Sequence, residues 1–132
     1  EVYVAIDTSG SMGAEELAEG AAEVRGVLKA IGAAVTFCSC DTEIHTQGRA
    51  RRLEDILSQL KGGGGTDFRP IFKAVATARP RPEVLVFITD GYGPSPAAPP
   101  PGVHVIALLV GPSVRPLPFG ENIRLGDNSN PS

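Results

Sequence analysis

The feature that most constrains the fold of this chain is the alternation of short, wholly apolar runs with helical stripes. Residues 2–6 and 84–88 carry almost no polar side chain, which is typical of strands buried on both faces of a parallel sheet. Between them, apolar residues recur at steps of four and three over residues 14–31, and a shorter stripe covers residues 70–78, which predicts two helices. Parallel neighbouring strands require crossover connections. The expected fold is therefore an α/β, doubly wound and mostly parallel sheet.

Four further segments complete the expected sheet and its helices. Residues 33–38 predict a second strand, and residues 42–46, beyond a turn, predict an antiparallel partner at the sheet edge. Residues 103–110 form the last clear apolar run, and residues 53–60 carry a short helical stripe. One antiparallel edge strand is thus expected beside the parallel ones.

The C-terminal third departs from regular strand and helix alternation. Residues 91–102 contain five prolines, so a polyproline-like loop is expected where a crossover helix normally lies. Residues 111–132 lack helical periodicity, so the domain should be reduced in helices at this end. Because a parallel sheet needs both faces covered, we expect another part of the parent protein to pack on any bare part.

Two glycines interrupt the predicted helix over residues 14–31. Gly20 and Gly26 each lower helix stability by about 1 kcal/mol relative to alanine. Such residues more often mark close packing of a helix on a sheet than a functional role. We expect both to face the sheet.

Composition limits the class of protein and its partners. A chain of 132 residues with 42% hydrophobic residues is sufficient for one domain, expected over residues 1–125, followed by a flexible tail over 126–132. The net charge of −3 and the lack of a basic stripe argue against nucleic acid. No apolar run approaches the ~20 residues that span a bilayer, so no membrane partner is expected.

Two observations concern the cellular setting of the chain. Cys38 and Cys40 stand too far apart along a strand to form a disulfide with each other. They are expected to be reduced, which favours a cytoplasmic location. The chain begins with Glu1 and enters a strand at once, which suggests a domain from a longer polypeptide.

The loop after the first apolar run carries the residues of a metal site. Asp7, Ser9 and Ser11 stand two residues apart in a glycine-containing turn, so that a carboxylate and two hydroxyls can point into one pocket. Oxygen ligands without thiolate or imidazole select hard divalent cations. The alternative is a solvated turn whose serines only cap the following helix.

Two further motifs are expected at the same end of the sheet. Asp90 follows the run over residues 84–88, and Thr66 follows four consecutive glycines that lead into the helix over residues 70–78. In the common doubly wound order, the first and fourth strands are neighbours, so Asp7 and Asp90 should lie side by side where ligands bind.

Taken together, Asp7-x-Ser9-x-Ser11, Gly-Gly-Thr66-Asp67 and Thr89-Asp90-Gly91 resemble the metal-ion-dependent adhesion site (MIDAS) of von Willebrand factor A (vWA) domains. The resemblance covers about residues 2–110 and implies a Rossmann-like fold. The segment 62–70 is further similar to a bacterial vWA-like family that lies C-terminal to a metallopeptidase-like region and is often encoded near MoxR-type AAA ATPases.

The resemblance also implies roles for the five residues. Ser9 and Ser11 would bind the cation directly, Thr66 directly or through water, and Asp7 and Asp90 largely through water. Mg²⁺ is the first choice, with Mn²⁺ or Ca²⁺ as alternatives. The implied function is a protein-binding module, not an enzyme, in which a partner's Asp or Glu carboxylate completes the metal site. Expected partners are the rest of the parent chain and a MoxR-type ATPase.

Three alternatives stay open at this point. Asp67 could orient Thr66, contact metal-bound water or cap the helix after it, and capping is favoured. An Asp-based phosphohydrolase also places an aspartate after its first strand, but its second acid would fall at Ser9. A purely structural vWA-like subunit with a vacant site is the third. His45 and His104 are expected to be ordinary strand residues.

Overall fold

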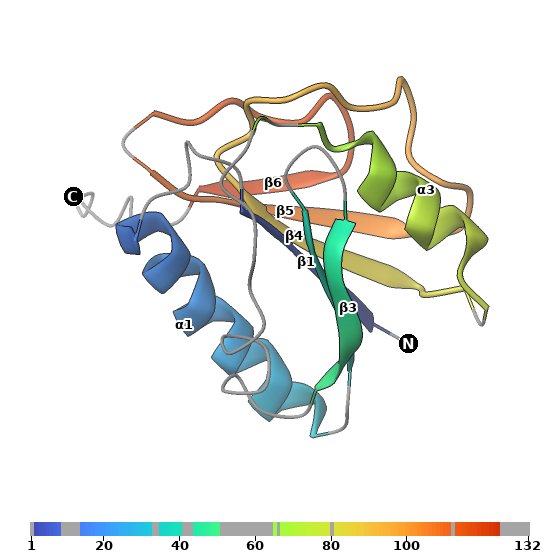
Figure 1. The fold of residues 1–132 in the computed structure, drawn as a ribbon, viewed down its shortest axis with the longest axis horizontal. Coiled ribbons are helices and arrows are strands. Elements are labelled where there is room, and N and C mark those ends of the chain that lie inside the picture. The colour runs from blue at the N-terminus through green and yellow to red at the C-terminus, as the bar shows by residue number, and fades with distance from the viewer. Residues whose placement is uncertain are drawn as a thin grey trace.

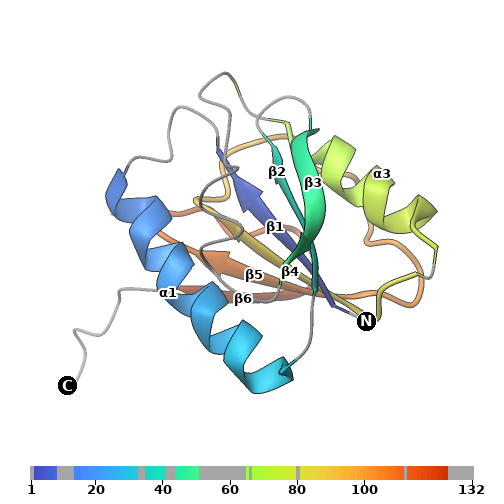
Figure 2. The same ribbon diagram turned by 60° about the horizontal axis from the view of Figure 1, so that its bottom comes forward.

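The computed structural model describes residues 2–8, 14–32, 35–40, 44–50, 65, 67–79, 81–111 and 113–124. Within them, six strands form one sheet: β1 (Val2–Asp7), β2 (Val35–Cys40), β3 (Ile44–Ala50), β4 (Val84–Thr89), β5 (His104–Leu109) and β6 (Glu121–Arg124). The described helices are α1 (Ala14–Ile31) and α3 (Arg69–Thr77). The two helices lie on opposite sides of the sheet (Figures 1 and 2).

The strands follow the order β3-β2-β1-β4-β5-β6. Strand β3 pairs antiparallel with β2 at one edge, and the other described pairings are all parallel. This confirms the predicted α/β sheet with an antiparallel edge strand, and it confirms that β1 and β4 are neighbours. From β1 the chain adds β2 and β3 toward one edge of the sheet, and it then crosses back to add β4, β5 and β6 toward the other edge. The strand order therefore reverses between β1 and β4, and doubly wound sheets bind ligands at such a point.

Alternate residues of the central strands enter two separate cores. The core on the α3 side combines β-strand residues such as Leu85 and Phe87 with Ile71, Phe72 and Val75 of the helix. The core on the α1 side contains the intervening strand residues, packed against Val24 and Leu28. The sheet is therefore buried on both faces, as its continuous apolar runs predicted.

Strand β6 was not predicted from the sequence. It contains one apolar residue, Ile123, and all four of its residues are exposed, so it has none of the alternation that marks a half-buried strand. It is held by parallel pairing with β5 and by Asn122, whose side-chain Oδ1 accepts from the Leu117 amide (2.9 Å) and whose Nδ2 donates to the Leu117 carbonyl (3.2 Å). Backbone pairing replaces side-chain burial here.

The other expected elements agree with the structure in kind and differ at their ends. β2 and β3 begin two residues later than predicted, and β3 runs on to Ala50. Residues 90–103 connect β4 to β5 without a helix, as the prolines predicted, and residues 113–124 also contain no helix. The helix predicted over residues 53–60 and the tail over 126–132 lie outside the described residues. Among the described helices, none is long and apolar enough to cross a membrane.

The two glycines of α1 differ in their surroundings. A Cβ atom added to Gly20 would overlap the Ile88 side chain of β4, so α1 approaches the sheet closely at this residue, as expected. At Gly26 an added Cβ would meet no heavy atom within 4 Å. The expectation that Gly26 faces the sheet is therefore wrong: this residue is exposed, and nothing in the structure requires glycine there.

Large apolar side chains are scarce on the surface of the described residues. Only Tyr92 and Ile123 are exposed among them. Hence this part of the chain offers no broad apolar face for a further segment of a parent protein.

Candidate metal site

Asp7 is the last residue of β1, and its side chain is held in a fixed position. Only 1% of the residue is exposed, and the Thr89 hydroxyl donates a hydrogen bond of 2.7 Å to Asp7 Oδ2. The Thr89 oxygen in turn accepts from the Gly91 amide at 3.0 Å. One threonine therefore links the end of β1 to the residues that follow β4.

Asp90 follows β4 directly and is also buried, with 6% exposed. Its Oδ1 accepts from the Tyr92 amide at 3.1 Å, which closes a local turn of the Asx type. Its carbonyl accepts from the Arg115 amide at 2.9 Å. Asp90 is thereby tied both to its own loop and to the connection between β5 and β6.

The residue after Asp90 has to be glycine for two reasons. Gly91 has φ +90°, a conformation that residues with a Cβ rarely adopt. An added Cβ would also overlap the carbonyl group of Arg115. The Thr89-Asp90-Gly91 motif thus owes its glycine to the contact between two loops at this edge of the sheet.

The structure brings Asp7 and Asp90 to the same edge. Strands β1 and β4 are paired in register up to Ile6 and Ile88, so both aspartates extend from the carboxyl ends of adjacent parallel strands. This confirms their predicted placement. Ser9, Ser11 and Thr66 lie outside the described residues, and their part in a five-residue site stays a prediction.

Asp67 interacts with the start of α3. Its Oδ1 accepts from the Arg69 amide at 3.0 Å, and the Arg69 guanidinium binds both carboxylate oxygens, at 2.9 and 2.8 Å. These hydrogen bonds hold the pKa of Asp67 below its usual value. Asp67 thus binds the first amide of α3, but the N-cap residue is Phe68 and the helix has no side-chain cap hydrogen bond, so the capping role favoured from the sequence is met only in this local contact.

The donor chemistry at this edge fits a hard cation. Asp7 and Asp90 supply carboxylate oxygens, and among the described residues no three His, Cys, Asp or Glu side chains form a group that could hold a metal ion by themselves. The Asp7 and Asp90 carboxylates lie at the ends of adjacent strands, and carboxylate oxygens are ligands that suit Mg²⁺, Mn²⁺ or Ca²⁺.

The family is shown by comparison with known proteins. A family model described as VWA-like domain (DUF2201) matches residues 2–126. The chain belongs to this family of VWA-like domains. A comparison with curated proteins gave no match.

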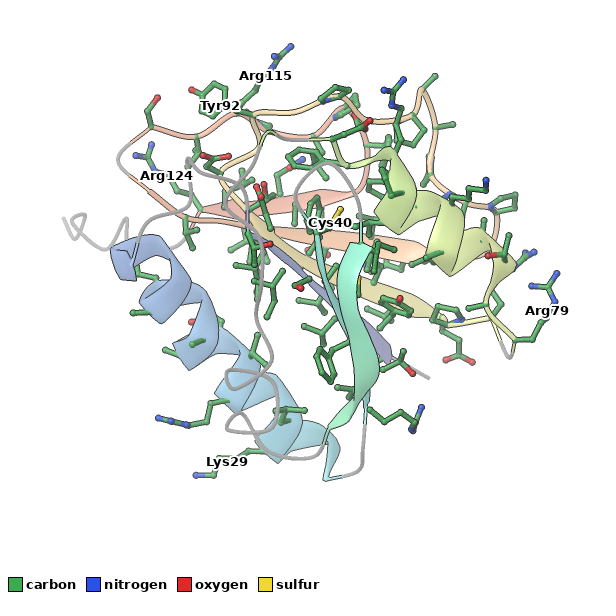
Figure 3. The ribbon with its side chains drawn as sticks, viewed as in Figure 1. Lys29, Cys40, Arg79, Tyr92, Arg115 and Arg124 are labelled. Carbon is green, nitrogen blue, oxygen red and sulfur yellow. The ribbon has the colours of Figure 1, made fainter. Side chains whose placement is uncertain are left out.

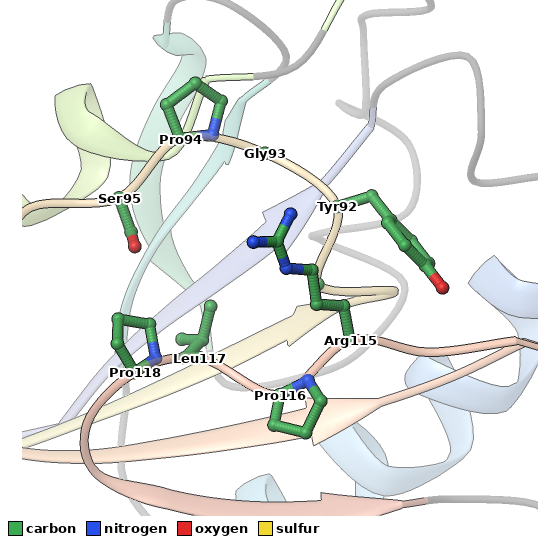
Figure 4. A pocket seen from close by; sticks show the side chains of 9 residues that line it. Tyr92, Gly93, Pro94, Ser95, Arg115, Pro116, Leu117 and Pro118 are labelled. Atoms are coloured by element: carbon green, nitrogen blue, oxygen red, sulfur yellow. The ribbon is translucent and has the colours of Figure 1, made fainter.

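The VWA-like domain has a cavity beside Asp90 that sequence reasoning missed. It measures about 580 Å³ and lies between residues 91–95, which follow β4, and residues 115–118, which precede β6 (Figure 4). The signal available in the sequence was proline content, which was interpreted as a connecting loop for residues 91–102 and was not considered for residues 115–118. The cavity forms because the two loops are tied together next to the strand ends.

The histidine that the structure describes in full plays no part in this site. His104 Nε2 lies 3.0 Å from Glu121 Oε1, and both side chains are exposed. It begins β5, at the opposite end from Asp90. His104 is an ordinary strand residue of the VWA-like domain, as expected.

Proposed function

We propose that this VWA-like domain is a metal-dependent protein-binding module. A divalent cation, Mg²⁺ first, would be held by Asp7, Ser9, Ser11, Thr66 and Asp90, and an Asp or Glu of a partner protein would complete the site. The observation that carries the proposal is the buried Asp7 carboxylate, fixed by Thr89, at the same strand ends as the buried Asp90.

The electrostatics of the two aspartates support a cation. Both side chains are buried at the carboxyl ends of adjacent strands, where a cation interacts with negative charge more strongly than it does in bulk water. Neutral donors reach both of them: the Thr89 hydroxyl donates to Asp7 and the Tyr92 amide donates to Asp90. A bound Mg²⁺ would supply positive charge between the carboxylates and accept a carboxylate oxygen from a partner.

The residues around the site would orient the ligands of the cation. Thr89 holds Asp7 Oδ2 through its hydroxyl, as partners of metal-bound carboxylates commonly do. The Tyr92 amide holds one oxygen of Asp90. Neutral hydroxyls at Ser9 and Ser11 would donate little charge to the cation, so that it stays attractive to a partner carboxylate. Recognition would then need no covalent step.

Calorimetric titration with Mg²⁺ and Mn²⁺ tests this proposal. Asp7→Ala and Asp90→Asn should each weaken binding at least ~10-fold, the loss typical of removing a group in or beside a metal site. Glu83→Gln is the matched control, because it removes one exposed carboxylate just before the start of β4, away from the site. Circular dichroism would verify folding, and equal binding by all four proteins would refute the metal site.

The enzyme alternative has its own assay. A phosphohydrolase would turn over a generic aryl phosphate in a metal-dependent manner, whereas a binding module should not. The partner is sought by affinity capture with the intact domain in Mg²⁺, with Asp90→Ala as the control. A MoxR-type AAA ATPase and the parent polypeptide are the first candidates, in a cytoplasmic setting.

A further inference from the structure

The cavity beside Asp90 has walls that are fixed by hydrogen bonds. One wall, residues 91–95, is anchored where the Pro94 carbonyl accepts from the Phe68 amide at 2.8 Å. The other wall, residues 115–118, is anchored by the Arg115 amide on the Asp90 carbonyl and by the two bonds between Leu117 and Asn122. Such a cavity is formed before any ligand arrives, which lowers the ordering entropy of binding.

The lining of the cavity combines flat apolar groups with one cation. Tyr92 is 43% exposed, and its hydroxyl and the Ser113 hydroxyl form a hydrogen bond of 2.9 Å. Pro94, Pro116 and Pro118 also line it and contribute no amide donors. The Arg115 side chain reaches between the two walls (Figure 4).

Arg115 is the charged group available to a ligand here. It is exposed and makes no ion pair with any described residue. Guanidinium groups bind carboxylates through two parallel hydrogen bonds. In a chain of net charge −3, an arginine without a described acidic partner, set above an apolar cavity, complements a ligand that is acidic and partly apolar.

We propose that this cavity is a second recognition subsite for an extended acidic peptide of a partner protein. Arg115 binds one carboxylate of the peptide, and the neighbouring apolar side chain packs on Tyr92 and the prolines. A second carboxylate reaches the strand ends at Asp7 and Asp90, and only this last contact rests on the proposed metal-dependent function. The domain would thus read two acidic residues rather than one.

Size and position support this assignment. The cavity volume of about 580 Å³ lies within the range of ~300–1,000 Å³ typical of ligand sites. It begins at Gly91, the residue after Asp90. An extended chain advances about 3.3 Å per residue. Two carboxylates that are two to four residues apart in a peptide could therefore reach Arg115 and the strand ends at Asp7 and Asp90 together.

Fluorescence anisotropy with defined peptides tests the subsite. The probes are fluorescein-labelled short peptides with one Glu, a Leu, and a second Glu about two to four residues from the first, a spacing set by the extended-chain rise. Matched probes carry Gln in place of either Glu. Arg115→Gln and Tyr92→Ala are compared with Arg79→Gln, which removes an exposed arginine at the far end of α3 (Figure 3).

If the subsite exists, Arg115→Gln should weaken binding of the two-Glu peptide about 10-fold in Mg²⁺, as expected for the loss of a charge-assisted hydrogen-bonded pair. Arg79→Gln should leave that binding unchanged. The Arg115→Gln protein should bind the two-Glu peptide and one of the two Gln-substituted peptides with equal affinity. Mg²⁺-dependent binding that is unchanged in both Arg115→Gln and Tyr92→Ala overturns the subsite and leaves the metal function standing.

The opposite result separates the two proposals. Binding that is lost in Arg115→Gln but insensitive to EDTA and to Asp7→Ala supports the subsite and refutes the metal-dependent function. Failure of folded wild-type protein to bind any peptide of the series at millimolar concentration overturns the subsite. Circular dichroism of each variant distinguishes loss of contact from loss of fold.

Discussion

The two faces of the sheet are covered in different ways. On one face, α1 of 18 residues supplies the described cover over a core that is aliphatic except for Phe37 (Figure 2). On the other, α3 has 9 residues, and the connections before β5 and β6 complete the layer with Val103, Leu117 and Phe119. This second face carries the aromatic contacts and the cavity.

The difference shows what irregular segments need in order to replace a helix. A helix satisfies its own backbone groups, whereas a loop that covers a core must find partners for them. In this domain the Phe68 amide, the Arg115 amide and the Asn122 side chain provide such partnerships. Prolines also reduce the number of amides that need one. Some of the same hydrogen bonds hold Asp90 and shape the cavity, so the loops that cover this face of the sheet also form part of the candidate site.

Phenylalanines on the two faces give the largest expected effect. Phe87 and Phe37 are both fully buried, and truncation of either to alanine should lower the free energy of unfolding by about 3–5 kcal/mol. Phe87 also makes edge-to-face contacts with Phe68 and Phe72, with ring centroids 4.9 and 6.1 Å apart. Each such contact adds about 0.5–1.5 kcal/mol. In urea denaturation, Phe87→Ala should therefore have a lower free energy of unfolding than Phe37→Ala.

Conservative variants serve as the control for this comparison. Phe87→Leu and Phe37→Leu retain most of the apolar volume, so that the difference between them isolates the ring contacts. Equal loss at both residues would mean that the aromatic cluster adds nothing to the loop-covered face.

Gly91→Ala should have the next largest effect, because it acts on the contact between the two loops. The φ of +90° and the overlap with the Arg115 carbonyl together should destabilise the domain by about 2–4 kcal/mol. Thermal denaturation measures the loss. Gly102→Ala is the matched control, since Gly102 has φ +79° but no atom within 4 Å of an added Cβ. If the two variants lose the same stability, backbone conformation alone accounts for Gly91.

The sequence was sufficient to predict most of the fold. Burial on both faces leaves a continuous apolar run, so β1 and β4 were found from hydrophobicity alone, and the helical period of α1 gave its limits. The position of Asp7 and Asp90 followed from the order of strands in doubly wound sheets. These features depend on patterns within short stretches of chain.

Other features depend on contacts between distant segments. Strand β6 is held by backbone pairing and by Asn122, neither of which leaves a hydrophobic pattern. Thr89 serves as the partner of Asp7 across 82 positions of sequence, and the cavity requires two loops to be tied together. The difference between Gly20 and Gly26 is likewise set by which side of α1 meets Ile88.

The pH dependence of stability tests the buried thiol on the loop-covered face. Burial raises the pKa of Cys38 from its ordinary value of 9.0 to about 12. Below pH 9 the thiol is protonated in both the folded and the unfolded chain. Between pH 9 and 12 only the unfolded chain loses the proton, so stability should fall with rising pH, by roughly 1 kcal/mol per unit.

Urea denaturation at pH 8, 9 and 10 measures this slope, and Cys38→Ala should flatten it. The window ends at pH 10 because Tyr3, whose pKa is also raised by burial from 10.0, contributes above that value. In the folded protein a thiol reagent should modify Cys38 slowly at pH 8. Fast modification without unfolding would show that this face is open to solvent.

The smallest expected effects come from the two glycines of α1, on the face covered by the helix. Gly26→Ala should raise stability by about 0.5–1 kcal/mol, because alanine favours the helix and an added Cβ meets nothing. Gly20→Ala gains the same propensity but forces its Cβ against Ile88, and overpacking of this kind lowers stability by about 1–3 kcal/mol. Gly20→Ala should therefore lower the free energy of unfolding by about 1 kcal/mol, whereas Gly26→Ala raises it. Ile88→Leu removes the Cγ2 methyl that an added Cβ at residue 20 would overlap, so it should recover part of the loss caused by Gly20→Ala and leave the effect of Gly26→Ala unchanged. Thermal denaturation of the wild type, the three single variants and the two double variants measures this coupling. Simple additivity of Gly20→Ala and Ile88→Leu would show that α1 does not pack on β4 at this residue.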